Sequence, residues 1–136
     1  MQALLTALYT KLSGSDLSNY VGGRIFTDEA PDGTDFPYVV IRIISSVPDK
    51  TFTEVYEDTL LQLSYFSTSA GLAEVSTMQG YGKALLDECS LSITGSTLVW
   101  MRRVNLVTMT DSITVGTGQA ILRHWAEDYE IKTSLN

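Results

Sequence analysis

The sequence predicts an α+β domain in which a largely antiparallel or mixed β-sheet carries two helices packed on one face. Two segments place apolar residues at helical spacing. The other apolar segments show strand patterns, and the links between them are short enough for hairpins between antiparallel neighbours. The expected order is α-β-β-β-α-β-β-β, and residues 1–136 are expected to form a single domain.

The first predicted helix covers residues 2–13. Four leucines recur there at spacings that place them on one helical face: Leu4, Leu5, Leu8 and Leu12. The sequence Ser13-Gly14-Ser15 supplies the end of the helix. Residues 16–23 form a polar connection that ends in two glycines, and residues 24–26 are expected to be a short strand.

An acidic loop is predicted over residues 27–36. Asp28, Glu29, Asp32 and Asp35 surround a proline and a glycine, and these residue types favour turns over strand ladders. A buried strand follows over residues 38–45, which contain five β-branched apolar side chains. After a polar turn at residues 48–50, apolar residues alternate with polar ones over residues 55–65. The two strands are therefore expected to form an antiparallel hairpin.

The second predicted helix covers residues 70–88. Six residues in it or directly after it fall on one apolar helical face: Leu72, Val75, Met78, Leu85, Leu86 and Cys89. Residues 91–94 and 98–110, joined by a glycine-serine turn, read as another hairpin. Residues 111–118 are rich in serine, threonine and glycine and are expected to be a connecting loop. The last strand is predicted over residues 119–132.

Composition and charge exclude several classes of protein. Apolar residues make up 44% of the chain and charged residues 18%, which is typical of an ordered globular domain. The net charge of −7 would repel phosphate backbones, so direct nucleic-acid binding is not expected. With one cysteine, no intrachain disulfide can form, which agrees with synthesis in a cytoplasm. Neither a signal sequence nor an apolar membrane span is recognisable.

The sequence contains no recognisable catalytic or cofactor site. His124 is the only histidine and lies in a strand pattern, which favours a structural role over metal ligation. Cys89 lies on the apolar face of the second helix, which favours core packing over nucleophilic catalysis. The acidic loop does not have the spacing of an EF-hand, and we interpret it as solvated or facing a partner. A small hydrolase or ligand-binding domain remains the alternative from another class.

Apolar residues occur on both faces of the predicted strands. Tyr56 and Phe66 share one face of their strand, whereas Val55, Leu61 and Tyr65 share the other. One layer of helices covers only one face of a sheet, so the other face would meet another protein or another copy of the chain. Ordinary core packing is the alternative explanation, and we favour oligomerisation.

Short motifs along the whole chain resemble one family. A leucine-rich helix is followed by Gly22-Gly23-Arg24-Ile25-Phe26, by Ala30-Pro31 and by Phe36-Pro37-Tyr38-Val39-Val40. Later, Phe66-Ser67 leads into a helix that ends at Leu85-Leu86-Asp87, and a strand-rich segment follows. This order resembles the tail-completion or tail-terminator proteins of long-tailed bacteriophages, which join heads to tails.

The resemblance implies a structural virion protein without catalytic residues or cofactors. Such proteins form a ring, typically of six copies, at the head-proximal end of the tail tube, where the ring stops tube polymerisation and contacts the head connector. The expected partners are therefore other copies of the chain, the tube protein and the connector. A head-completion or tail-tube protein of related fold is the nearest alternative.

Three polar loops are the predicted contact elements within this hypothesis: residues 27–36, 47–53 and 111–118. The predicted interface residues are Asp28, Glu29, Asp32, Asp35, Asp49, Lys50, Asp111 and Thr114.

Overall fold

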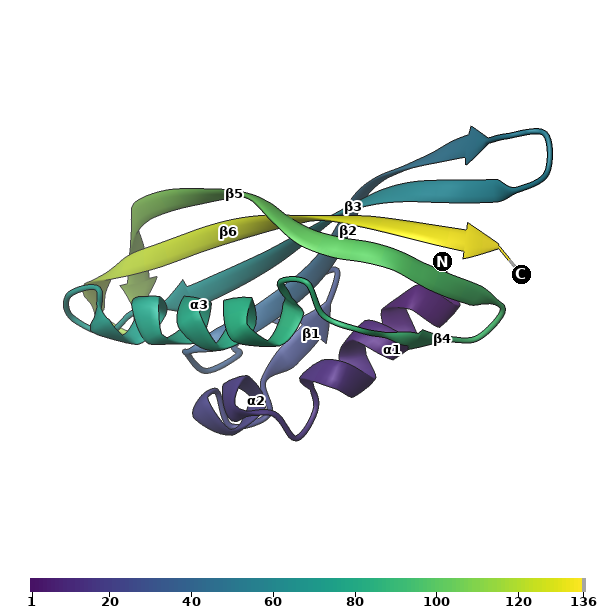
Figure 1. Cartoon of the computed structure of the whole chain (residues 1–136). Helices are drawn as coiled ribbons and strands as arrows, with labels where there is room; N and C mark the ends of the chain where they lie inside the picture. The colour runs from purple at the N-terminus through teal and green to yellow at the C-terminus, as the bar shows by residue number, and fades with distance from the viewer. Residues whose placement is uncertain (136) are drawn as a thin grey trace.

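The computed structural model describes residues 1–135, apart from the side chain of Val115. Within these residues, three helices accompany one six-stranded sheet (Figure 1). The elements are α1 (Gln2–Leu12), α2 (Asp16–Tyr20), β1 (Ile25–Thr27), β2 (Tyr38–Lys50), β3 (Val55–Ser67), α3 (Ala73–Leu86), β4 (Ser92–Ile93), β5 (Ser96–Val115) and β6 (Gly118–Leu135). The predicted α+β class is therefore confirmed.

The sheet is mixed rather than purely antiparallel. Its strand order is β1-β2-β3-β6-β5-β4. The short edge strand β1 pairs with β2 in parallel, whereas the other four pairs are antiparallel. The loop between β1 and β2 must bring the chain back to the start of β2, and this return makes the parallel pairing possible. The central strands β3 and β6 are antiparallel, so the start of β3 lies beside the end of β6. For this reason the β2–β3 and β5–β6 hairpins turn at opposite ends of the sheet (Figure 1).

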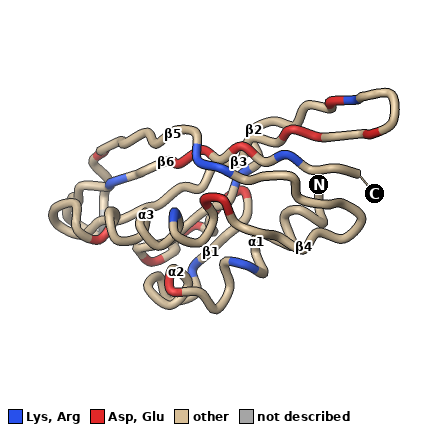
Figure 2. The backbone as a smooth tube through the Cα atoms, viewed as in Figure 1, with Lys and Arg blue, Asp and Glu red and all other residues tan. Residues whose placement is uncertain are grey.

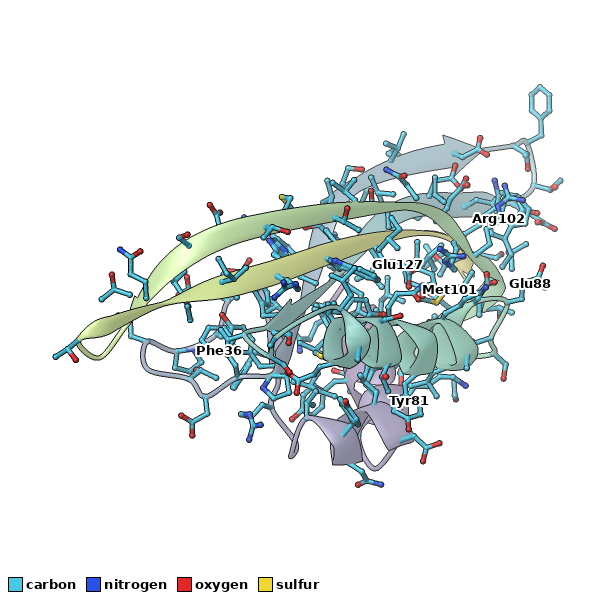
Figure 3. All side chains as sticks on the ribbon, turned by 90° about the vertical axis from the view of Figure 1, so that its left-hand side faces the viewer. Phe36, Tyr81, Glu88, Met101, Arg102 and Glu127 are labelled. Atoms are coloured by element: carbon cyan, nitrogen blue, oxygen red, sulfur yellow. The ribbon has the colours of Figure 1, made fainter. Side chains whose placement is uncertain are left out.

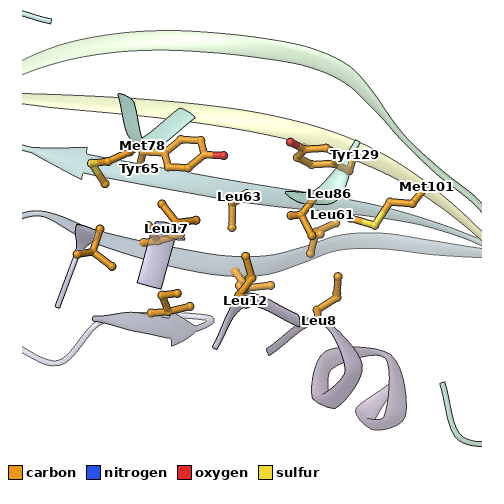
Figure 4. Close-up of a cluster of buried hydrophobic side chains, with 14 of the residues drawn as sticks. Leu8, Leu12, Leu17, Leu61, Leu63, Tyr65, Met78, Leu86, Met101 and Tyr129 are labelled. Carbon is orange, nitrogen blue, oxygen red and sulfur yellow. The ribbon is translucent and has the colours of Figure 1, made fainter. Parts of the chain in front are cut away.

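The core lies between the helices and one face of the sheet (Figure 4). Alternate residues of the strands point to this face, so Leu61, Leu63 and Tyr65 of β3 are buried together with Tyr129 and Ile131 of β6. From the helices, the cluster receives Leu8 and Leu12 of α1, Leu17 of α2, and Val75, Met78 and Leu86 of α3. Burial of one leucine side chain stabilises the folded state by roughly 2 kcal/mol. Because burial contributes this much, the spacing of apolar residues predicts these elements well.

A third helix, α2, was not expected from the sequence. The segment that we predicted as a polar connection contains one turn and a half of helix. The Oγ atom of Ser15 accepts a hydrogen bond from the backbone N–H of Ser18 at 3.2 Å, which caps the helix. Leu17 is its one buried residue. A five-residue helix is too short to show apolar periodicity, so the cap and a single leucine are its only signals.

Two of the three predicted loops, residues 47–53 and 111–118, are largely strand. Residues 111–115 continue β5, and β6 begins at Gly118, so the expected loop at 111–118 is a tight turn around Gly116 and Thr117. Gly116 has a φ of 62°, a conformation that glycine adopts without strain. Likewise, β2 continues to Lys50, which pairs with Val55, so only residues 51–54 form the turn. Ile113, Thr114 and Val115 favour extended backbone and help to explain why β5 extends further than predicted.

Candidate functional site

A buried charge cluster lies between β6, β5 and α3 (Figure 3). The side chain of Glu127 is fully buried. Its carboxylate accepts hydrogen bonds from the hydroxyl of Tyr129 at 2.6 Å and from Nε2 of Gln79 at 2.7 Å. It also forms an ion pair with Nε of Arg103 at 2.8 Å. The carboxylate is thus neutralised and hydrogen-bonded, as burial requires.

The two tyrosines of this cluster are held in their protonated form. Burial raises the pKa of Tyr65 well above its ordinary value, and the charge of Glu127 acts in the same direction. Burial, followed by the hydrogen bond to Glu127, also raises the pKa of Tyr129. The protonated hydroxyl of Tyr65 donates to Glu127 at 3.4 Å, as that of Tyr129 does. Gln79 of α3 donates to the same carboxylate, so the cluster joins α3 to the sheet. Because every member is engaged inside the protein, the geometry supports a structural role.

Sequence reasoning missed Glu127, although a signal was present. Residues two apart in a strand point to the same face. Glu127 therefore lies on the same, core-facing side of β6 as Trp125, Tyr129 and Ile131. An acid at such a position needs a buried partner. Arg102 and Arg103 are neighbours in β5 and point to opposite faces of the sheet, as strand geometry requires: Arg102 pairs with Glu130 and Arg103 with Glu127.

The prediction that Cys89 packs against the core is confirmed, but its predicted position on the second helix is wrong, because α3 ends at Leu86. Cys89 is half-buried against the core, with its Sγ atom 3.6 Å from Sδ of Met101. Burial raises the pKa of its thiol, which disfavours the reactive thiolate.

His124 lies in an aromatic ladder on the sheet face opposite the core. Its ring stacks on Phe66 with centroids 4.2 Å apart, and Phe66 stacks on Tyr38 at 4.7 Å. Burial lowers the pKa of His124, and the charge of Asp111 opposes this shift. Its Nε2 atom is buried without a hydrogen-bond partner among the described residues. The geometry therefore favours a neutral ring that packs within the ladder.

The acidic loop is exposed at each of its four acids: Asp28, Glu29, Asp32 and Asp35. One weak ion pair, of 3.9 Å, links Asp28 to Arg42 of β2. Among residues 1–135, no group of three or more histidine, cysteine or acidic side chains is placed to hold a metal ion.

The structure places the predicted interface residues in three separate regions rather than one site (Figure 2). The acidic loop flanks β2 near the β1 edge of the sheet. Asp49 and Lys50 lie beside the turn of the β2–β3 hairpin, and Asp111 and Thr114 lie near the turn of the β5–β6 hairpin. All eight residues are exposed. They are therefore accessible, but they do not converge.

Apolar side chains accompany these polar residues on both hairpins. On the β2–β3 hairpin, Phe52 has a relative exposure of 109%, and Val47 is 57% exposed. On the β5–β6 hairpin, Val107, Met109 and Ile121 are each at least 40% exposed. Exposed apolar groups on projecting hairpins are typical of protein–protein contact surfaces.

An open groove of about 700 Å³ lies between α1 and the segment that contains β4. Its walls are formed by the side of α1 that bears Ala3, Ala7 and Lys11 and by residues around Leu91. Small apolar and hydroxyl side chains dominate, and Lys11 is the one charged residue among the described residues that line it. The groove can therefore accept an apolar side chain accompanied by negative charge.

None of the three helices in residues 1–135 has the length and apolar character needed to span a membrane.

Comparisons with known proteins agree with this architecture. One chain in the solved structure of the virion of a native gene transfer agent particle superposes with a TM-score of 0.77, at 16% identity, over 96% of this chain and 94% of that chain. Another solved chain superposes with a TM-score of 0.53, at 12% identity, over the same shares. At these identities the likeness shows the fold alone. No curated protein matches the sequence.

The family is shown by a different comparison. The model of a family described as tail completion protein gp17 matches residues 6–131, which is nearly the whole chain. This match confirms the family that the sequence motifs resemble. The chain belongs to the tail completion protein gp17 family and is a phage structural protein of the virion.

Proposed function

We propose that six copies of this chain form a ring at the head-proximal end of a phage tail tube, where the ring stops tube polymerisation and provides the surface to which the head connector docks. The observation that carries this proposal is the placement of exposed polar and apolar side chains on two hairpins at opposite ends of one sheet. A subunit built in this way can contact a different partner at each end. Membership of the tail completion family supports the same role.

Ring closure explains how such a protein ends a polymer. A cyclic assembly needs two different, complementary surfaces on each subunit, and closure at a fixed number stops lateral growth. A closed ring on the end of a tube covers the surface to which the next tube layer would bind, and it presents a different upper surface. The partners are therefore sister copies, the tube protein and the connector. The role requires no cofactor, nucleic acid or membrane.

The buried cluster around Glu127 fits a structural role and requires no catalytic step. Its charge is compensated inside the protein, and it fixes the packing of α3 on the sheet. Subunits that must fit a ring of fixed geometry benefit from a rigid core of this kind.

Polymerising tube subunits provide the test. The purified protein is added at about one ring per hundred tube subunits, and tube length is measured over time. The proposal predicts that growth stops at this substoichiometric amount. Tubes that lengthen by incorporating the protein would instead indicate a tube protein, and unaffected growth would contradict termination.

A further inference from the structure

The turn of the β2–β3 hairpin presents one aromatic side chain to solvent. The side chain of Phe52 buries none of its apolar surface within the chain, because its relative exposure is 109%. The turn itself is ordered by hydrogen bonds: the N–H of Thr51 donates to the carbonyl of Glu54 at 2.9 Å, and the N–H of Glu54 donates to Oγ1 of Thr51 at 3.0 Å. Phe52 is thus held outward on a closed turn, which lowers the entropic cost of binding.

Negative charge surrounds this aromatic side chain. The hairpin carries four acids against one lysine: Asp49, Glu54, Glu57 and Asp58 against Lys50. The acids are visible along both arms of the hairpin (Figure 2). Asp49 and Asp58 share Lys132 of β6, at 3.0 and 3.5 Å, and the hydroxyl of Tyr56 binds Glu54. These contacts fix the acids in place while leaving the hairpin with net negative charge.

The groove between α1 and β4 is complementary to this hairpin turn. Its small side chains leave about 700 Å³ of space, enough for an aromatic ring and the turn that carries it. Lys11 supplies a positive charge, and no acid occurs among the described residues that line the groove. We propose that the turn of the β2–β3 hairpin of one copy, with Phe52 at its centre, docks into the α1–β4 groove of a second copy, where Glu54 faces Lys11.

The placement of the two surfaces gives this contact the geometry that a ring requires. The hairpin is formed by β2 and β3, whereas the groove borders β4 at the far edge of the sheet. Figure 1 shows the hairpin rising away from the helix layer and α1 beside β4 on the other side of the sheet. Because the hairpin turn and the groove are two different surfaces of the same subunit, the contact is head-to-tail and can be repeated around a ring. This inference rests on the proposed ring and names the contact that closes it.

Disulfide trapping tests the contact directly. In a Cys89→Ser background, Thr53→Cys, which keeps Phe52 and lies beside it on the exposed turn, is combined with Ala7→Cys. The protein is oxidised mildly under conditions in which the wild type is imaged for rings. We expect a ladder of covalent oligomers on a non-reducing gel that ends at the ring size. The pair Thr53→Cys with Thr77→Cys is the matched control, because Thr77 is exposed on α3 outside the groove. The control should give no ladder.

Charge exchange provides a second test that does not depend on cysteine geometry. Lys11→Glu should raise the protein concentration needed for half-maximal ring formation about tenfold, and adding Glu54→Lys should restore much of the loss. Lys83→Glu changes the net charge equally on exposed α3 and should have no effect. Phe52→Ser should raise the required concentration roughly thirtyfold, whereas Leu72→Ser, which alters another exposed apolar residue, should not.

The outcomes separate this contact from the proposed function. If wild-type rings form, but the cysteine pair gives no ladder and Phe52→Ser assembles normally, the contact is wrong and the ring proposal stands. If the wild type forms no ring alone or on tube ends, both proposals fall. A ladder together with charge rescue confirms the contact.

Discussion

Gly82 of α3 lies against the hydroxyl of Tyr65 so closely that a Cβ atom at this position would stand 1.9 Å from the tyrosine oxygen. Tyr65 is fully buried on the core face of β3. The absence of a side chain at Gly82 therefore allows α3 to approach the sheet and to bring Gln79 to Glu127. One glycine thus determines how closely the helix and the sheet pack.

Gly82→Ala is expected to destabilise the protein by about 2 kcal/mol, because either Tyr65 or the helix must move despite the better helix propensity of alanine. Gly80→Ala in the same helix is the matched control, since nothing lies within 4 Å of its added Cβ. That substitution should stabilise the protein by about 0.5–1 kcal/mol. Urea denaturation measures both values. Equal effects at the two positions would show that close packing at Gly82 is unimportant.

Arg103→Met is expected to cost about 3 kcal/mol, because Glu127 would keep a buried charge without its cationic partner. Glu127→Gln removes that charge and retains an acceptor for Tyr129, so it should cost about 1 kcal/mol. Arg102→Met is the neighbouring control, because its pair with Glu130 is partly exposed and should contribute less than about 1 kcal/mol. If both arginine variants lost the same stability, the buried pair would have no special role.

Stability should fall as the pH rises above 10. Tyr65 and Tyr129 have raised pKa values in the folded protein, so they remain protonated where the unfolded chain, with the ordinary value of 10.0, loses protons. Their stabilisation is therefore complete below pH 10 and is lost above it. In a plot of the free energy of unfolding against pH, Tyr129→Phe should reduce the slope above pH 10 by about 1.4 kcal/mol per pH unit. An unchanged slope in Tyr129→Phe would contradict this explanation.

Neutralising the acidic loop should weaken assembly without affecting the fold. The quadruple variant Asp28→Asn, Glu29→Gln, Asp32→Asn and Asp35→Asn changes only exposed side chains, so the free energy of unfolding should shift by less than about 0.5 kcal/mol for each substitution. Asparagine also tolerates the positive φ of Asp28. Joining of heads to tails, counted in an in vitro assembly assay, should drop about tenfold. Full joining by this variant would remove the loop from the contact surface.

Apolar periodicity predicts the large elements of this fold, because burial is what stabilises them. The leucines of α1 and the alternation around Leu61 and Leu63 place these segments on the core face, and the structure buries them there. The family could also be predicted, because its short motifs extend along most of the chain. Element ends were less accurate: the strand through Asp111 and Thr114 was interpreted as a loop, because polar residues on an exposed hairpin resemble loop composition.

The parts that could not be predicted depend on residues distant in the sequence. Glu127 can be buried because Arg103 of β5 and Gln79 of α3 reach it from two other elements. The importance of Gly82 depends on Tyr65 in another layer. The groove beside Lys11 likewise exists only once β4 lies beside α1. A local pattern can indicate that an acid faces the core, but it does not identify the partner residues from other elements, which only the structure shows.

The most direct test of the ring proposal is electron microscopy of the purified protein with tail tubes, combined with its mass in solution at the same concentration. The account predicts rings of uniform diameter, equivalent to six copies of the 14.9 kDa chain, seated on one end of each tube. Tubes whose ends stay bare at saturating protein, with the protein remaining monomeric, would contradict it.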